Sequence, residues 1–466
     1  MVSRSHTIDT LLIISGNAIN RPTQVNLKNA TTHSVTIPDG TLIAVGGLYA
    51  PTIRYDKGKF YIICTNVFDG QFENFYITCN DIWANNWSDP IPFNFHGIDP
   101  SLFFDDNGRV YVQGSHVIDY SKQPSCIIKQ FEIDIQTGKP LTEQRDIWEG
   151  HAKIDPEGPH MYKRGKWYYL MIAEGGTFKH HMLSIARSRN VWGPFESYEN
   201  NPILTADGTS NEIQNVGHGE LFQDEEGLWW AAALGVRNRD GCYPLGRETF
   251  LTPVDWPSGG WPTIEPIAIN MERASKSLGV TKEFSTQSGH GYVYIRDAIM
   301  DHHEIQKDNR IVLTASDSNL STPGGTTTFV GLRQWDIECT TTATLFPENL
   351  QATAGLAVYK DDYRHAEIFF DPSLGAVCFT AKCFPPSGDR IITTDIIPSD
   401  QIQFAIHAAE IGYDFRFRQS ATSEWHSIFT LDAKLMTAND FTGALFGIYA
   451  SGQGDAAFGD FKVEKK

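Results

Sequence analysis

The chain has 466 residues, which exceeds the size of one ordinary domain, so two domains are expected. Its net charge of −18 argues against nucleic acid and an anionic membrane surface as partners. Hydrophobic residues make up 41% of the chain, enough for sizeable cores, but no stretch approaches the length of a membrane span. The many Gly and Pro residues between short β-branched and aromatic runs predict an all-β protein.

A short pattern occurs four times in the first half of the chain. Each copy runs from a head residue through an apolar stretch to a polar turn with Gly, and an aromatic or β-branched strand follows. The copies are APTIRYDKGKFY from Ala50, DPSLFFDDNGRVY from Asp99, EGPHMYKRGKWYY from Glu157 and HGELFQDEEGLWW from His218. Their turn glycines are Gly58, Gly108, Gly165 and Gly227. Repeats with the spacing of these glycines, and with four short strands each, predict the blades of a β-propeller.

The heads of the repeats predict a reaction centre. In a propeller the innermost strand of every blade lines the central axis, so equivalent positions of successive blades converge on one space. Asp99, Glu157 and His218 are expected to meet there although they are far apart in the sequence. Two carboxylates and an imidazole in one place are suited to general acid–base catalysis.

The second half of the chain has a different character. The propeller pattern covers residues 1–270 and lapses into a polar linker, which leads over 271–310 into a second domain. From residue 311 to 466, many alternating runs joined by turns, from IVLTAS to FGDFKVE, predict a β-sandwich. We find no catalytic cluster in this part of the sequence.

The cysteines and the N-terminal segment indicate a cytoplasmic location. The seven cysteines are odd in number, no pair has CxxC spacing, and most lie in apolar, strand-like surroundings that predict buried thiols. The segment MVSRSHTIDTLLIISG is a poor signal peptide, because its apolar run is short and is preceded by Asp9.

Several long motifs follow one another in a specific order. They are GGLYAPTIRY (46–55), GIDPSLFFDDNG (97–108), EGPHMYKR (157–164), AEGGT (173–177), GHGEL (217–221), LGVR (234–237) and PLGRETFLTPVDW (244–256). In this order they resemble glycoside hydrolase family 43, which includes β-xylosidases and α-L-arabinofuranosidases. FVGLRQ (329–334) and FTGALFGIYASG (441–452) resemble the β-sandwich that many members append. The resemblance covers almost the whole chain and implies a five-bladed β-propeller followed by a concanavalin-like β-sandwich.

The resemblance also implies roles for five residues. The family hydrolyses glycosidic bonds with inversion, using an Asp base, a Glu acid and a second Asp that adjusts the pKa of the acid. Glu157 matches the general acid and Asp99 the pKa modulator. Arg237 matches an arginine that contacts the sugar, and Tyr49 stands where relatives often have Trp, so we expect a stacking wall there. His218 matches a histidine that in some members helps to hold a metal ion, so no cofactor is required but a structural Ca²⁺ at the axis is left open.

Each role has a simpler alternative. Glu157 could be a surface glutamate at the start of a strand, and Asp99 a turn residue before proline. His218 could be an interior histidine with ordinary partners, Arg237 a member of a salt bridge, and Tyr49 part of the core.

The general base is the main departure from the family. The family's base Asp lies in an opening motif similar to NPDPS, and this chain has none. SHTIDTLLIISGNAINRPTQVNL (5–27) already resembles the later part of the first blade, so that blade is expected to be incomplete. The other Asp-Pro pairs, at Asp89, Asp155 and Asp371, lie elsewhere in the pattern. The chain is either truncated or a natural relative without turnover.

Two functions remain after this comparison. The first is an exo-acting hydrolase of xylan degradation that removes terminal β-1,4-xylosyl or α-L-arabinofuranosyl residues from xylo-oligosaccharides or arabinosides. The second is a catalytically dead carbohydrate-binding relative. A propeller that serves only as a protein-interaction platform is the weakest alternative, and a homo-oligomer is left open.

Overall fold

The computed structural model describes residues 17–21, 24–37, 40–269, 291–384, 390–396 and 399–465. This part of the chain is almost entirely β-structure and forms two compact units. The first unit takes the described residues of 1–25, 47–237 and 248–283, and the second those of 26–46, 238–247 and 284–466. The 3₁₀ helices of the described chain are η1 (Ile82–Ala84), η3 (Met300–His302) and η4 (Ala433–Leu435).

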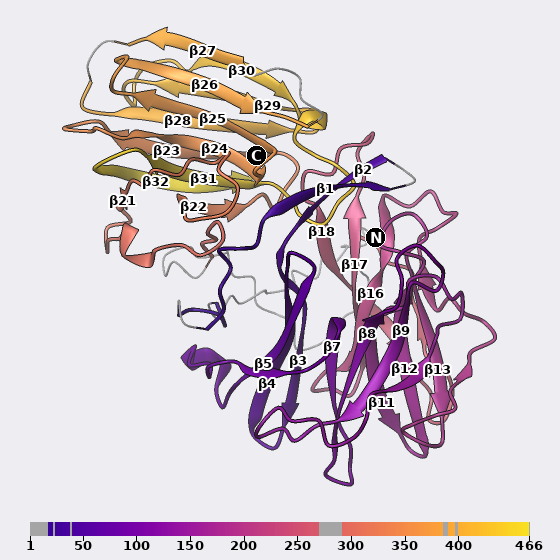
Figure 1. Cartoon of the computed structure of the whole chain (residues 1–466). Coiled ribbons are helices and arrows are strands. Elements are labelled where there is room, and N and C mark those ends of the chain that lie inside the picture. Colours follow the sequence, from indigo (N-terminus) through magenta and orange to yellow (C-terminus); the bar gives the residue numbers. More distant parts are fainter. Residues whose placement is uncertain are drawn as a thin grey trace. The chain divides into compact units, whose positions relative to one another are not determined.

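The first unit consists of sheets that follow one another along the chain (Figure 1). The first contains β3 (Gly47–Asp56), β4 (Lys59–Phe68), β5 (Gln71–Cys79) and β6 (Ile91–Phe93). The second contains β7 (Gly97–Phe104), β8 (Val110–Val117), β9 (Cys126–Glu132) and β10 (Arg145–Trp148). The third contains β11 (Glu157–Arg164), β12 (Trp167–Glu174), β13 (Met182–Ser188), β14 (Glu196–Ser197) and β15 (Leu204–Thr205). The fourth contains β16 (Ile213–Gln223), β17 (Trp229–Arg237), β18 (Arg247–Asp255) and β19 (Thr263–Ile264).

These sheets are blades of the predicted propeller. The first strand of each sheet lies at its edge, and β3 contacts β7, β7 contacts β11, and β11 contacts β16. We call β3, β7, β11 and β16 the inner strands. Four of the five expected blades lie in the described chain. The segment 5–27, expected to belong to the first blade, falls largely on residues 1–16 and 22–23, outside the described residues, so its completeness stays a prediction.

The turn glycines of the repeats have the role that the sequence suggested. Gly58, Gly108, Gly165 and Gly227 lie in the hairpins between the first two strands of their sheets, with φ angles of 83°, 83°, 59° and 80°. A side chain at such a φ is strained, whereas glycine adopts it freely.

Apolar side chains hold neighbouring blades together. Ile63 and Tyr76 of the first sheet pack in one cluster with Leu102 and Val112 of the second, and all four are fully buried. Burying a side chain of this size stabilises a fold by about 1.5–3 kcal/mol. The same packing recurs between the third and fourth sheets, and it keeps the inner strands in place.

The second unit is the predicted β-sandwich. One sheet has the strand order β20 (His303–Ile305), β21 (Ile311–Thr314), β32 (Asp455–Lys465), β23 (Cys339–Phe346), β28 (Ile402–Ala409), β29 (Gly412–Arg418) and β30 (His426–Asp432). The other has the order β22 (Thr328–Arg333), β31 (Leu445–Ser451), β24 (Thr353–Asp361), β25 (Arg364–Asp371), β26 (Ala376–Lys382) and β27 (Arg390–Asp395). Leu356 and Ile368 of one sheet and Phe404 and Phe415 of the other meet in its buried core.

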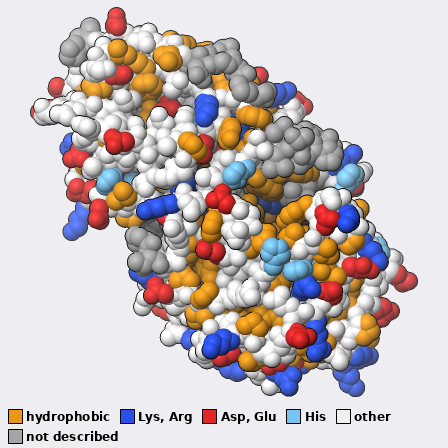
Figure 2. Space-filling view, viewed as in Figure 1, with side chains coloured by type: hydrophobic (Ala, Val, Ile, Leu, Met, Phe, Trp, Pro, Cys, Tyr) orange, Lys and Arg blue, Asp and Glu red, His pale blue; other side chains and the backbone are white. Residues whose placement is uncertain are grey.

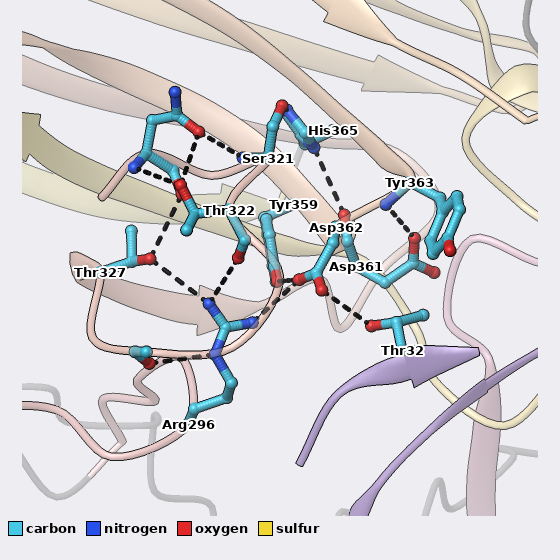
Figure 3. A network of polar contacts seen from close by, with 12 residues as sticks. Thr32, Arg296, Ser321, Thr322, Thr327, Tyr359, Asp361, Asp362, Tyr363 and His365 are labelled. Atoms are coloured by element: carbon cyan, nitrogen blue, oxygen red, sulfur yellow. Dashed lines mark hydrogen bonds and ion pairs between the residues drawn. The ribbon is translucent and has the colours of Figure 1, made fainter. Parts of the chain in front are cut away.

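The second unit also takes in a hairpin that precedes the blades in sequence. Thr32, in the hairpin β1 (Thr32–Ile37) and β2 (Gly40–Val45), donates its hydroxyl hydrogen to Asp362 Oδ2 at 3.2 Å. Asp362 Oδ1 accepts hydrogen bonds from Arg296 Nη1 (2.9 Å) and the Tyr359 hydroxyl (3.0 Å), as Figure 3 shows. Buried polar groups need such partners.

The two units therefore interleave along the chain, which the continuous division into 1–270, 271–310 and 311–466 did not describe. Besides the hairpin, residues 238–247 belong to the second unit, where the Pro244 carbonyl accepts a hydrogen bond from the Ala444 N–H at 2.9 Å. Part of the proposed linker, residues 271–290, lies outside the described residues. Contacts between segments so distant in sequence leave no local pattern.

The charged surface and the buried cysteines fit the expectations from the composition. Acidic and basic side chains are interspersed over the face shown in Figure 2. None of the described residues belongs to a helix that is long and apolar enough to cross a membrane. All seven cysteines are buried and outside disulfides, and burial was expected for most of them.

Candidate active site

Each inner strand is interrupted by a β-bulge. The pairing of every inner strand with the next strand of its sheet shifts register. In each inner strand one residue at such a shift has a positive φ: Ala50 (39°), Asp99 (55°), Gly158 (54°) and His218 (38°). In β16 a second shift carries Asn215, with a φ of 55°. Residues with a side chain rarely adopt this conformation, and such strain is concentrated at functional sites. The bulges therefore mark one place in each blade as a candidate site.

The bulges correct the alignment of the third repeat by one residue. Gly158, and not Glu157, is structurally equivalent to Asp99 and His218. Glu157 precedes its bulge, in the position that Ile98 holds before Asp99. The sequence pattern placed the charged head of EGPH at the bulge, whereas the positive φ there favours the glycine that follows.

Asp99, Glu157 and His218 nevertheless lie together. The Gly158 N–H donates to Asp99 Oδ2 at 3.2 Å, which brings Asp99 beside the residue after Glu157. The same oxygen lies 3.8 Å from His218 Nδ1. The Asp99 side chain is 4% exposed, whereas that of Glu157 is 21% exposed. Of the two carboxyl groups, Glu157 is thus the one that a substrate can reach.

His181, just before β13, is a member of this cluster that the sequence did not reveal. Its Nε2 lies 3.8 Å from Glu157 Oε1, and its Nδ1 lies 3.1 Å from the Asn215 carbonyl oxygen. A carbonyl only accepts hydrogen bonds, so Nδ1 carries the hydrogen, and in the neutral ring Nε2 presents its lone pair toward Glu157. The ring lies against Gly217, where an added Cβ would be 2.4 Å from it. We call Asp99, Glu157, His181 and His218 the carboxylate cluster.

Arg54 of β3 lies between the inner strands and was also missed. Its Nε donates to the Leu102 carbonyl at 3.1 Å, and its Nη2 lies 3.0 Å from both Ser101 Oγ and His160 Nδ1. Its Nη1 pairs with Glu220 of β16 and donates to the Ile53 carbonyl at 2.7 Å. One guanidinium group thus contacts all four inner strands. Its sequence signal was a charged residue in the apolar strand APTIRY.

The charge of Arg54 disfavours a metal ion next to it, and a structural Ca²⁺ held by His218 stays a prediction. Burial lowers the pKa of Arg54, but arginine remains charged at neutral pH and repels a second cation. Burial, and then the charge of Arg54 and His218, lower the pKa of His160 well below its ordinary value, so His160 is neutral. His218, the expected ligand, lies beside Asp99. The described chain has no group of three His, Cys, Asp or Glu side chains that could hold a metal ion.

Arg237 and Tyr49 have different surroundings. Arg237, at the end of β17, forms a bidentate ion pair with Glu248 of β18, with distances of 2.8 and 2.7 Å. This is the salt bridge that the sequence left open, and a contact of Arg237 with a sugar stays a prediction. Tyr49 is half-buried and immediately precedes the bulge at Ala50, the position that Glu157 has in its blade.

Tyr120 is a further aromatic residue near the cluster, in the connection between β8 and β9. Its pKa is raised to about 12, first by loss of water around the hydroxyl and then by Cys126, Glu157, Tyr49 and Asp99. The residue as a whole is 71% exposed, so most of it is open to solvent. A single Tyr in the polar loop IDYSKQPS gave no sequence signal.

Most glycoside hydrolases use a pair of carboxyl groups, and here an accessible and a buried one lie together on the inner strands. The sequence model described as "Glycosyl hydrolases family 43" matches residues 4–262. A second, described as "Beta xylosidase C-terminal Concanavalin A-like domain", matches residues 282–464. The chain belongs to glycosyl hydrolase family 43.

Individual relatives are similar over nearly the whole chain. One is a non-reducing end α-L-arabinofuranosidase of Bacteroides ovatus, 31% identical over 463 residues, which cover 95% of this chain and 83% of the relative. Another is a β-xylosidase of Bacillus subtilis, 30% identical over 449 residues, with 86% and 83% covered. The crystal structure of a xylan β-1,4-xylosidase from Bacillus halodurans is similar with a TM-score of 0.83 at 25% identity, covering 96% and 90%. These similarities confirm the predicted family, the enzyme class and the propeller-plus-sandwich fold.

The general base stays unassigned. Asp99 and Glu157 are the carboxyl groups of the cluster, and the resemblance gives both of them other roles. Residues 1–16 lie outside the described residues, so the expected departure in the first blade remains a prediction.

Proposed function

We propose that the protein removes single terminal sugars, β-1,4-xylosyl or α-L-arabinofuranosyl residues, from xylo-oligosaccharides or arabinosides with inversion at the anomeric carbon. The observation that carries the proposal is the approach of buried Asp99 to the partly exposed Glu157 through the Gly158 N–H. The names of the relatives support both sugars and removal from the non-reducing end.

The chemistry assigns one step to Glu157. The protonated carboxyl group gives its proton to the glycosidic oxygen as the bond from that oxygen to the anomeric carbon breaks. Water attacks the anomeric carbon from the opposite face and loses a proton to a base, which inverts the configuration. Asp99, held by the Gly158 N–H and close to His218, lies beside the acid, where the resemblance places the modulator of its pKa.

The second candidate is a carbohydrate-binding protein that binds the same sugars without turnover. Both candidates have a carbohydrate ligand and need neither a nucleic acid nor a membrane. The seven buried free thiols support a reducing, cytoplasmic location.

One experiment separates the two candidates. The purified protein is incubated with 4-nitrophenyl β-D-xyloside and 4-nitrophenyl α-L-arabinofuranoside, with and without azide, and the anomer of the product is read by NMR. Hydrolysis without azide identifies an enzyme with a functioning base. Release only with azide, giving the α-xylosyl azide from the β-xyloside, identifies a working sugar pocket without a base. If the protein releases no aryl group and also fails to bind xylose, both candidates are contradicted.

We expect Tyr120→Ala to raise KM about 3- to 10-fold while kcat changes little. An aromatic face contributes roughly 0.5–1.5 kcal/mol to a stacked contact, and the exposed ring of Tyr120 is free to stack on a sugar. Tyr120→Phe keeps the ring and is the matched control, with KM close to that of the wild type. Steady-state kinetics on the better aryl glycoside measure the effect, and an unchanged KM in Tyr120→Ala would exclude contact with the sugar.

A further inference from the structure

We propose that Glu174, at the end of β12, is a positioning residue for the general acid Glu157. Its carboxylate holds the backbone of the connection that leads from β10 into Glu157. The inference rests on the proposed role of Glu157 as acid, but it concerns a residue to which neither the repeat pattern nor the cluster assigns a function.

The side chain of Glu174 accepts hydrogen bonds from the backbone of this connection. Glu174 is fully buried. Its Oε2 accepts a hydrogen bond from the His151 N–H, and its Oε1 accepts from the N–H groups of Ala152 and Lys153, each at 3.0 Å. A buried carboxylate is costly unless it is hydrogen-bonded, and three N–H donors satisfy this one. One side chain thus fixes three successive residues.

The fit around Glu174 is tight. Gly150 has a φ of 92°, and an added Cβ there would lie 2.1 Å from Glu174 Oε1. Gly175, which follows Glu174 in the chain, donates its N–H to the Ile154 carbonyl at 2.9 Å. The backbone of residues 150–154 therefore lies directly on the end of β12.

The same strand end is paired with the acid itself. Ala173, the neighbour of Glu174, is the partner of Glu157 in the ladder of β11 and β12. At the far end of the connection, the Pro156 carbonyl accepts a hydrogen bond from Ser115 Oγ at 2.8 Å. Only residues 154–156 separate the held segment from Glu157, so a shift of the segment is passed on to the acid.

Glu174→Gln is the sharpest variant, because it keeps the shape of the side chain. Its amide NH₂ cannot accept a hydrogen bond, so in either orientation at least one N–H of the connection loses its partner. A displacement of about 1 Å can cost roughly 10²-fold in rate, and only steps that need the proton of Glu157 should suffer. We expect this loss for xylobiose, whose leaving group needs an acid, and less than about 3-fold for 4-nitrophenyl β-xyloside, whose leaving group does not.

The control is Asp105→Asn. Asp105 is likewise buried and accepts hydrogen bonds from Lys163 Nζ (2.5 Å) and the Tyr168 hydroxyl (3.1 Å), but it follows β7 at the end opposite Asp99. Asp105→Asn should lower Tm as Glu174→Gln does, and it should reduce the rates on both substrates by the same factor. Both variants are assayed with azide, so that the comparison does not depend on a base.

The result that overturns the proposal is an equal loss on both substrates in Glu174→Gln, as in the control. If the wild type releases no aryl group even with azide, the proposed function fails instead. The crystal structures of the wild type and Glu174→Gln then decide the positioning role, and an unmoved Glu157 carboxyl group rejects it.

Discussion

Glu157→Gln should lower the rate on xylobiose by roughly 10²–10⁴-fold, the usual contribution of a general acid. The amide keeps the size of the side chain next to His181 but has no proton to give to the leaving oxygen. On 4-nitrophenyl β-xyloside the loss should be much smaller, because 4-nitrophenolate departs without protonation. The ratio of kcat/KM on the two substrates measures the effect.

The matched control is Glu196→Gln, which changes an exposed carboxyl group on β14 of the same sheet. It should leave both rates unchanged. An equal loss on both substrates in Glu157→Gln would contradict the role of acid and indicate a structural role. The comparison is made with azide as well, so that it remains informative if the base is missing.

Arg54→Met should destabilise the propeller by about 1–3 kcal/mol, the cost of leaving the buried partners of a hydrogen-bonded group unsatisfied. Glu220 would keep a charge without its guanidinium partner, and Ser101, the Leu102 carbonyl and His160 would each lose a donor. The contacts of Arg54 join all four inner strands, so we also expect weaker sugar binding. Chemical denaturation measures the stability.

Two comparisons make this result specific. Arg21→Met breaks a pair with Asp89 in which both side chains are more exposed, 39% and 76%, and should cost less than about 1 kcal/mol. The double variant Arg54→Met/Glu220→Met removes both charges and should be closer to the wild type than Arg54→Met alone. Wild-type stability of Arg54→Met would show that the guanidinium does not hold the inner strands together.

Much of the architecture follows from local sequence. Strands alternate with a period of two residues, and tight turns demand glycine, so the repeats and their glycines can be read without contacts between distant residues. The strands β27 and β30 show this pattern less clearly. Each is the last strand of its sheet, and β30 is largely exposed, so it lacks a clean alternation of apolar and polar residues.

The sequence by itself determined the family, the all-β class, the two kinds of domain and the expectation that Asp99, Glu157 and His218 lie together. Tertiary structure decided that Gly158 occupies the bulge, that His181 faces Glu157, and that Arg54 and Glu174 hold the strands and the connection around the cluster. The difference has a physical cause. Turn and strand preferences act between neighbours in the chain, whereas a buried charge is placed by partners that only folding brings within hydrogen-bond distance.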